Sequence, residues 1–300
     1  MPSTVEIKRI GAVLCDEARP LPERFRALFT LRNLGGETAI DYIVECFSDQ
    51  SALLKHECAY CLGQMQDKYA IPKLVTVLKD TKQDTMVRHE AGEALGAIGC
   101  NSVMGILKEY CNDPIIEVAE TCQLAVERIE WLHSKEKQKE SSKNPFSSVD
   151  PAPPLTEEDL VVLQRKLLDE KLPLFDRYRA MFSLRNINSD ASALALAEGL
   201  KCSSALFRHE IAYVLGQMQN AAGIKQLKCN LQQEDENPMV RHECAEALGS
   251  IAAQECLHTL QDFTQDKEVV VRESCEVALD MLQYEQSEDF QYADTLVKLS

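Results

Sequence analysis

Four pairs of adjacent histidine and glutamate residues have the types and the spacing in this 300-residue chain that are suited to chemistry. The chain has six histidines, and four of them directly precede a glutamate, giving His56-Glu57, His89-Glu90, His209-Glu210 and His242-Glu243. Imidazole and carboxylate ligands without thiolate favour iron, manganese or zinc over copper(I). Two histidines with one carboxylate also match the ligand set that leaves open positions on non-haem Fe(II), and two such sets would make a dinuclear centre.

The chain is a tandem duplication with an offset of 153 residues. The segment RFRALFTLRN at 24–33 matches RYRAMFSLRN at 177–186, and MVRHEAGEALG at 86–96 matches MVRHECAEALG at 239–249. Each half is itself repetitive, with equivalent positions spaced by 31, 33 and 31 residues at Phe25, His56, His89 and Glu120 and at Tyr178, His209, His242 and Glu273. Repeats of this length, filled with helical patterns, fit one helix pair each.

The sequence therefore predicts an all-α fold, an α-solenoid of eight HEAT-like helical-hairpin repeats in two halves of four. In the third repeat, the apolar periodicity predicts a helix over 70–78 and a second helix over 86–98. The predicted organisation is an N-terminal half at 1–133, a polar and proline-rich flexible linker at 134–156, a C-terminal half at 157–284 and an acidic tail at 285–300. Thr156 is expected to cap the first helix of the second half.

The His-Glu pairs occur only in the two middle repeats of each half, so repeat packing alone does not require them. A single His-Glu pair on a helix is usually a solvated surface pair. Four pairs in the same register favour metal binding instead, because equivalent residues on stacked helices lie on one face, about 8–10 Å apart. Two histidines from neighbouring helices could then meet, and four pairs would line one cleft if the two halves faced each other.

The composition limits the partners and the compartment. The formal net charge of −16 disfavours binding to nucleic acid or anionic membranes and favours basic partners. The sequence shows no signal peptide and no apolar run of membrane-spanning length, so the twelve cysteines are expected to be reduced thiols of a cytoplasmic protein. Cys58 and Cys61 have metal-site spacing, but Ile211 and Val214 occupy the matching positions, which indicates core side chains.

Two resemblances extend these predictions. The step from Asp84 to Val87-Arg88, repeated at Asn237 and Val240-Arg241, resembles the internal ladder of the HEAT-like repeat family. Two four-repeat halves with His-Glu in the middle repeats resemble the deoxyhypusine hydroxylase family over essentially the whole chain. That resemblance implies a di-iron, O2-dependent monooxygenase that hydroxylates the deoxyhypusine side chain of a translation factor to hypusine.

The resemblance also implies roles for the eight residues of the pairs. Two Fe2+ ions would be held by His56, His89 and Glu90 in the first half and by His209, His242 and Glu243 in the second. Glu57 and Glu210 would face the ammonium groups of the substrate, with no further catalytic side chain beyond the metal centre. The expected partners are O2, an external reductant and a protein substrate with a basic loop, bound by a monomer.

Two other functions remain open on the sequence. One is a metal-free HEAT-repeat scaffold that binds a basic protein partner. The other is a dinuclear hydrolase that uses a metal-bound water.

Overall fold

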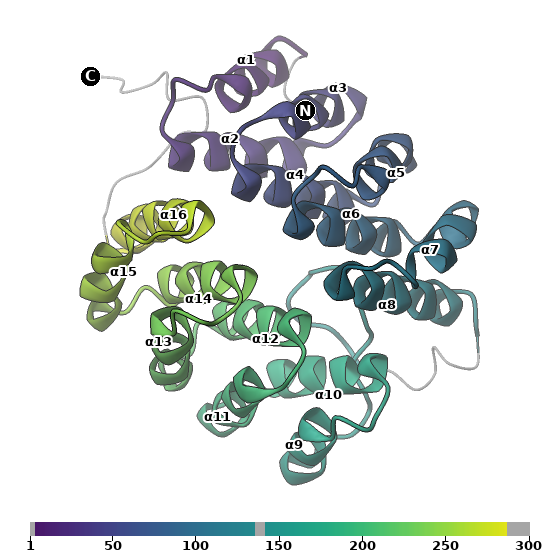
Figure 1. The fold of residues 1–300 in the computed structure, drawn as a ribbon, viewed down its shortest axis with the longest axis vertical. Coiled ribbons are helices and arrows are strands. Elements are labelled where there is room, and N and C mark those ends of the chain that lie inside the picture. Colours follow the sequence, from purple (N-terminus) through teal and green to yellow (C-terminus); the bar gives the residue numbers. More distant parts are fainter. Residues whose placement is uncertain (1–3, 136–141, 287–300) are drawn as a thin grey trace. The chain divides into compact units, whose positions relative to one another are not determined.

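The computed structural model describes residues 4–135 and 142–286, which fold into sixteen α-helices joined by turns and short 3-10 segments (Figure 1). These residues fall into two compact units, the first ending at Ile129 and the second beginning at Glu130. The first half of the chain forms α1 Thr4–Cys15, α2 Leu21–Leu34, α3 Glu37–Glu45, α4 Ala52–Met65, α5 Ile71–Lys79, α6 Thr85–Ile98, α7 Met104–Tyr110 and α8 Ile116–Leu132. The second half forms α9 Leu160–Leu168, α10 Leu174–Ile187, α11 Asp190–Glu198, α12 Ala205–Met218, α13 Ile224–Gln232, α14 Pro238–Ile251, α15 Leu257–Phe263 and α16 Val269–Glu285.

The predicted all-α hairpin architecture is confirmed in the described residues. The helices predicted at 70–78 and 86–98 are α5 and α6, each within one residue of the predicted ends. Within each hairpin the second helix is the more deeply buried; in α6 nearly every side chain is buried, because α4 and α5 both pack against it. Such a helix carries small and apolar residues on all sides rather than along one stripe.

Side-chain caps fix where the second helices of the middle repeats begin. The side chains of Ser51, Asp84, Ser204 and Asn237 accept hydrogen bonds from backbone N–H groups in the first turns of α4, α6, α12 and α14. These caps satisfy backbone donors that would otherwise have no partner within the helix. The predicted cap at Thr156 is wrong: α9 begins at Leu160, and the carboxylate of Asp159 accepts from the N–H groups of Val161 and Val162.

Glycines let the second helices of the middle repeats approach their neighbours closely. A Cβ atom on Gly63 would lie 2.8 Å from Cα of Ala94 on the next second helix, closer than real Cβ atoms approach. The same contact recurs between Gly96 and Ala125, Gly216 and Ala247, and Gly249 and Ala278, at 2.9, 3.0 and 2.6 Å. Each glycine follows a histidine of a His-Glu pair by seven residues, two helical turns, so it lies on the same side of the helix as that histidine.

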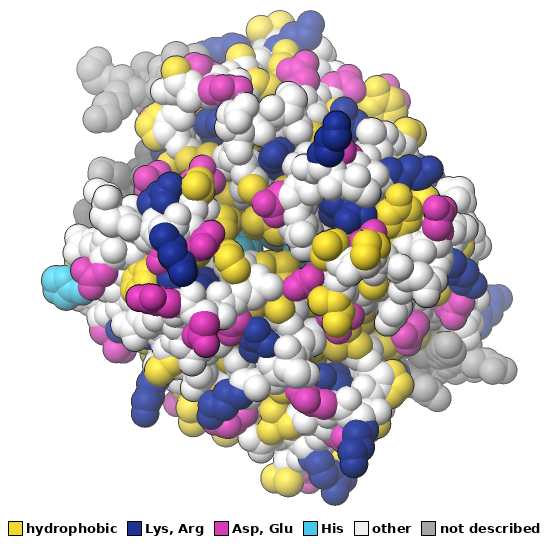
Figure 2. Space-filling view, viewed as in Figure 1, with side chains coloured by type: hydrophobic (Ala, Val, Ile, Leu, Met, Phe, Trp, Pro, Cys, Tyr) yellow, Lys and Arg dark blue, Asp and Glu magenta, His cyan; other side chains and the backbone are white. Residues whose placement is uncertain are grey.

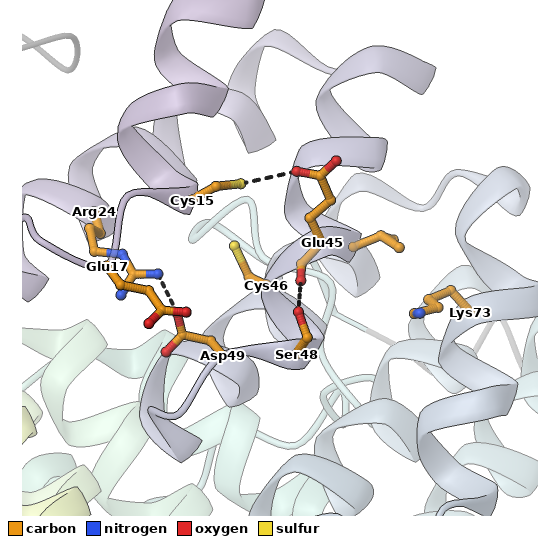
Figure 3. A pocket seen from close by; sticks show the side chains of 9 residues that line it. Cys15, Glu17, Arg24, Glu45, Cys46, Ser48, Asp49 and Lys73 are labelled. Carbon is orange, nitrogen blue, oxygen red and sulfur yellow. Dashed lines mark hydrogen bonds and ion pairs between the residues drawn. The ribbon is translucent and has the colours of Figure 1, made fainter.

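Buried arginines link each of several repeats to the next. Nε of Arg88 donates to the carbonyl of Leu78, and its Nη2 lies 2.6 Å from Asp113. Arg241 makes the same contacts with Leu231 and Asp266, and Arg24 pairs in the same way with Asp49 (Figure 3). The arginines next to the His-Glu pairs are therefore packing residues, as their recurrence in the sequence predicts.

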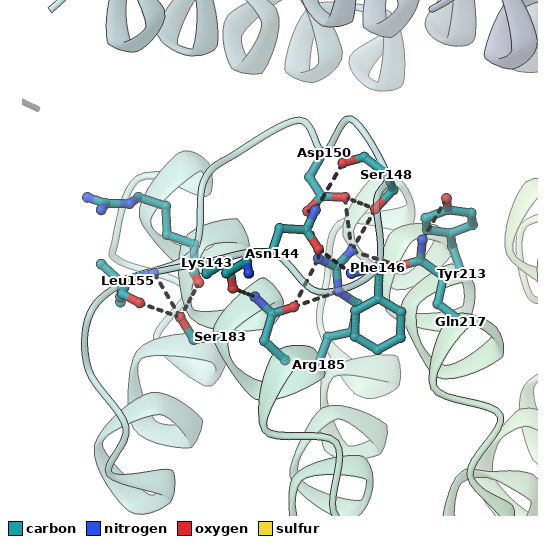
Figure 4. Close-up of polar contacts among 12 residues, drawn as sticks. Lys143, Asn144, Phe146, Ser148, Asp150, Leu155, Ser183, Arg185, Tyr213 and Gln217 are labelled. Carbon is teal, nitrogen blue, oxygen red and sulfur yellow. Dashed lines mark hydrogen bonds and ion pairs between the residues drawn. The ribbon is translucent and has the colours of Figure 1, made fainter. Parts of the chain in front are cut away.

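The described part of the segment predicted as a flexible linker packs on the second unit (Figure 4). Arg185 of α10 is fully buried, and its guanidinium binds Asp150 at 2.7 Å, Asn144 at 3.0 Å and Gln217 at 2.8 Å. Leu155 N–H donates to Ser183 Oγ at 2.8 Å. A buried guanidinium needs such partners, so this stretch is held in place and differs from the free linker that its composition indicates. Residues 136–141 of the segment lie outside the described residues.

Eight of the twelve cysteines are buried, and Cys229 is exposed. All twelve are free thiols, as predicted. Cys58 and Cys61 are fully buried, and burial is the main cause that raises the pKa of each thiol. Their CxxC spacing therefore reflects core packing.

Charged side chains cover the surface without gathering in one patch on the face drawn in Figure 2, where acidic and basic groups are interspersed. In the described part of the chain, no helix is both long enough and apolar enough to cross a membrane. Of the predicted acidic tail, residues 287–300 lie outside the described residues.

The substitution Asp113→Asn tests the arginine ladder, that is, the pairs Arg24–Asp49, Arg88–Asp113 and Arg241–Asp266 that link successive repeats. It removes the negative charge beside buried Arg88 while keeping an oxygen that accepts from Ile115 N–H, so we expect the free energy of unfolding at neutral pH to fall by about 1–3 kcal/mol. Burial raises the pKa of the Asp113 carboxyl, but the Arg88 hydrogen bond and charge outweigh burial and leave that pKa below its ordinary value. The contribution of the carboxylate to the free energy of unfolding is therefore complete above the ordinary pKa. It is lost as the pH falls through the lowered pKa of the folded state.

Urea denaturation from pH 7 downward measures this difference, which should shrink toward zero in acid. The matched control is Asp84→Asn, because exposed Asp84 caps α6 without an arginine partner among the described contacts and Asn is an equally good cap. Equal destabilisation by both substitutions at pH 7 would contradict the ladder.

Candidate metal centre

The four His-Glu pairs occupy equivalent positions in four helices. His56-Glu57 is on α4, His89-Glu90 on α6, His209-Glu210 on α12 and His242-Glu243 on α14. In every helix the histidine comes five residues after the capping residue and seven before the glycine of the close helix contact. The cap and the glycine therefore set both the height and the direction of each histidine.

All eight side chains are buried. Their exposed fractions run from 0% at His89 and His242 to 6% at Glu57 and Glu243. Burying a carboxylate costs several kcal/mol unless a cation or hydrogen-bond donors compensate for it. In each unit, two carboxylates and two imidazoles form a set of buried groups whose negative charge favours a bound cation.

In the first unit, His56, His89 and Glu90 converge on one point. The imidazole rings lie 5.5 Å apart at 44°, and Nε2 of His56 lies 3.3 Å from a carboxylate oxygen of Glu90. One ligand atom from each of the three residues lies within 4.8 Å of the other two. Ligands bound at about 2.0–2.2 Å from one ion lie roughly 3–4.4 Å from each other. The 3.3 Å between His56 Nε2 and the Glu90 carboxylate lies in that range.

In the second unit, the equivalent pairs of side chains lie at similar distances. The rings of His209 and His242 lie 5.4 Å apart at 42°, and Nε2 of His209 lies 3.5 Å from a carboxylate oxygen of Glu243. The two sets thus agree within 0.2 Å and 2°, as expected where the same helix register and the same glycine contact recur.

Other side chains hold the imidazoles in place. In the first unit, Nδ1 of His56 lies 3.2 Å from the carboxylate of Glu57. In the second, Nδ1 of His242 lies 3.4 Å from Ser274 Oγ and 3.6 Å from Glu246, and the serine hydroxyl donates to Glu246 at 3.0 Å. Contacts of this kind fix the ring orientation and the tautomer of a metal-binding histidine.

Ser274 and Glu246 were missed by the sequence reasoning. At both positions a feature of the sequence could have indicated a contact with the histidine. Ser274 stands in the last repeat where the middle repeats have the glutamate of the pair, and Glu246 follows His242 by one helical turn. Only the distances between side chains show that they support the neighbouring histidine.

The pKa of His56 also indicates that the first set favours positive charge. Burial lowers that pKa, but the hydrogen bonds to Glu57 and Glu90 raise it by more than burial lowers it. The pKa of His56 therefore lies well above the ordinary value. A proton or a metal ion can supply the charge, and a metal ion bound here would displace the proton.

Paired helices that carry buried imidazole and carboxylate groups define a HEAT-like repeat protein with a candidate metal site. Residues 22–95 and 40–127 match the HEAT repeats family, and residues 176–202 and 240–266 match the PBS lyase HEAT-like repeat. Over its full length the chain is about 60% identical to deoxyhypusine hydroxylases, and it belongs to that family.

Full-length relatives show this membership. The chain is 60% identical to the deoxyhypusine hydroxylase of Danio rerio over 301 residues, which cover 100% of this chain and 99% of that protein. It is 62% identical to the Homo sapiens protein, over 98% of this chain and 97% of the relative. The solved structure of human deoxyhypusine hydroxylase in complex with glycerol matches with a TM-score of 0.91, covering 94% of this chain and 97% of that one.

The substitution Glu246→Gln tests the support of His242. It removes the charge beside Nδ1, so we expect metal affinity in the second unit to fall by about 10- to 100-fold while the helix content is unchanged. Titration of the metal against a chromophoric chelator measures the affinity. Glu276→Gln is the matched control, because Glu276 is exposed on α16. The assignment is wrong if both variants bind metal like the wild type.

Proposed function

We propose that this chain is an iron-dependent monooxygenase that hydroxylates the deoxyhypusine side chain of a translation factor, using O2 and an external reductant. The observation that carries the proposal is the repeated, buried set of two imidazoles and one carboxylate, at nearly the same distances in both units. The full-length identity of about 60% to deoxyhypusine hydroxylases supports the activity.

Two Fe2+ ions would be held by the two sets, one by His56, His89 and Glu90 and one by His209, His242 and Glu243. The neighbouring thiols support a site without sulfur. Burial raises the pKa of Cys61 and Cys244 well above the ordinary value, and the carboxylates of Glu57 and Glu243 respectively raise it further. These thiols stay protonated, which leaves nitrogen and oxygen ligands of the kind that non-haem iron uses. Iron bound there would activate O2 for insertion of one oxygen atom into a C–H bond.

Glu57 and Glu210 would bind the substrate. Both are buried, and each directly follows a histidine of the proposed ligand sets. Deoxyhypusine is a long aliphatic chain with two protonated amines, and a buried carboxylate would bind an ammonium group through a charge-assisted hydrogen bond. Holding the amine at a fixed distance from the ligand histidine determines which carbon reaches the oxidant.

The shielding of the site supports oxidation rather than simple partner binding. Because the eight pair residues are at most 6% exposed, bulk water is excluded from the reacting groups. A metal-free scaffold, the alternative function, would bury four carboxylates in a protein whose packing needs none of them at these positions. A requirement for O2 and a reductant would in turn exclude the dinuclear hydrolase.

The protein substrate is proposed to present a basic loop, since the net charge of −16 attracts a cationic partner over a distance. The charges are spread over the visible face, which favours steering over tight pairing at one patch (Figure 2). We further propose a monomer in the cytoplasm, where twelve free thiols would remain reduced.

The direct test is turnover of a deoxyhypusine-bearing protein by the purified chain with Fe2+, O2 and a reductant. We expect mass spectrometry to show a gain of about 16 Da, one oxygen atom, on the modified lysine. His242→Ala should abolish the gain, whereas Glu276→Gln, at an exposed position on α16, should keep it. Turnover without O2, or undiminished turnover by His242→Ala, would contradict the proposal.

The substitution Glu57→Gln separates substrate binding from metal binding. Glutamine can still accept a hydrogen bond from Nδ1 of His56, so we expect the metal content to be unchanged. Losing the charge that binds ammonium, worth about 1.5–3 kcal/mol, should lower kcat/KM roughly 10- to 150-fold, mainly through KM. Loss of metal with an unchanged KM would instead make Glu57 a support for His56.

A further inference from the structure

Arg177 of α10 occupies an arginine position that recurs three more times in the chain. Nε of Arg24, Arg88, Arg177 and Arg241 each donates, at 2.8–3.0 Å, to the carbonyl of a leucine ten residues earlier. At three of these positions the guanidinium then pairs with an aspartate 25 residues further along, namely Asp49, Asp113 and Asp266. The residue 25 positions after Arg177 is Cys202.

Arg177 is consequently a buried cation without the carboxylate that its three equivalents have. It is 4% exposed, and its Nη2 has no hydrogen-bond partner among the described residues. The ring of Phe207 covers the guanidinium, with Cζ 4.0 Å from the ring centre, but gives it no hydrogen bond. The nearby carboxylate of Glu170 accepts from Ser203 N–H at 2.6 Å. A buried charge of this kind favours an anion at residue 202.

Cys202 is within reach of small molecules from solvent. It lines a surface cavity of about 320 Å³ together with Lys201, Arg208 and Glu236 (the last two paired with each other). Burial holds the pKa of the Cys202 thiol above its ordinary value, and the charge and hydrogen bond of Arg177 limit that rise. The cavity therefore gives small molecules access to the Cys202 thiol, and the positive charge of Arg177 stabilises an anion at that position.

We propose that Cys202 is an oxidative modification site, whose sulfinate takes the place of the missing aspartate and binds Arg177. The two groups have the same connectivity: an aspartate carries two oxygens on the atom bonded to Cβ, and so does a cysteine sulfinate. The modified residue would complete the fourth position of the arginine ladder. The site is separate from the proposed metal centre and does not depend on the proposed function.

The chemistry needs a hydroperoxide, such as hydrogen peroxide. In the first step the sulfur attacks one peroxide oxygen, so an S–O bond forms, the O–O bond breaks, sulfur loses two electrons and water carries away the thiol proton. A second equivalent repeats the transfer and converts the sulfenic acid to sulfinic acid, which ionises. Arg177 stabilises the attacking thiolate and the final anion.

Peptide mapping of the full chain after graded hydrogen peroxide treatment tests the proposal, with a chelator present to suppress metal-catalysed oxidation. We expect a gain of about 32 Da at Cys202, and Cys229, an exposed thiol on α13, serves as the internal control for peroxide exposure. Arg177→Gln should lower the rate at Cys202 several-fold and leave Cys229 unchanged. Conversion of Cys229 alone, or an unchanged rate at Cys202 in this variant, would overturn the proposal.

A second measurement does not require Arg177 to be altered. Cys202→Asp supplies the anion directly, and Cys202→Asn matches its shape without the charge. We expect the melting temperature of Cys202→Asp to exceed that of Cys202→Asn by about 2–4 °C. A melting temperature of Cys202→Asp at or below that of Cys202→Asn would show that the position rejects an anion and would overturn the proposal.

Discussion

The close approach of neighbouring second helices at a glycine is the contact on which the site depends. Gly63 faces Ala94, and Gly216 faces Ala247, at distances that no side chain larger than hydrogen allows. The outer repeats, which lack the His-Glu pair, have arginine or an acidic residue in place of these glycines. The small residues and the ligands therefore occur in the same repeats, because imidazoles two turns away meet only where the helices are close.

The buried charges of the fold are compensated in two different ways. Along the hairpin turns, three of the four equivalent arginines, such as Arg88, have an aspartate from the next repeat, and each such pair is a fixed structural link. In the candidate metal centre, carboxylates such as Glu90 lie among imidazoles, where a bound cation would compensate their charge. The first arrangement holds the repeats together, whereas the second would bind an ion that supplies the chemistry.

Much of this was predictable from the sequence, because the repeat spacing and the helical periodicity are local signals. They predicted α5 and α6 within one residue and the core role of Cys58 and Cys61. The contacts that were missed are between distant residues of low-complexity or repeated segments. The packing of Asp150 on Arg185 could not be predicted from a polar, proline-rich stretch, and neither could the contact of Ser274 with His242. Likewise, Asp159 rather than Thr156 caps α9 because the helix begins later than its pattern indicates.

The most direct test of the account is the iron content of the wild-type chain beside that of His89→Ala and His242→Ala, which alter equivalent positions of the two ligand sets. The account predicts about two iron ions per wild-type chain, and equal losses in the two variants because the two sets have the same geometry. A wild-type chain with one iron or none, or a loss confined to one variant, would contradict it.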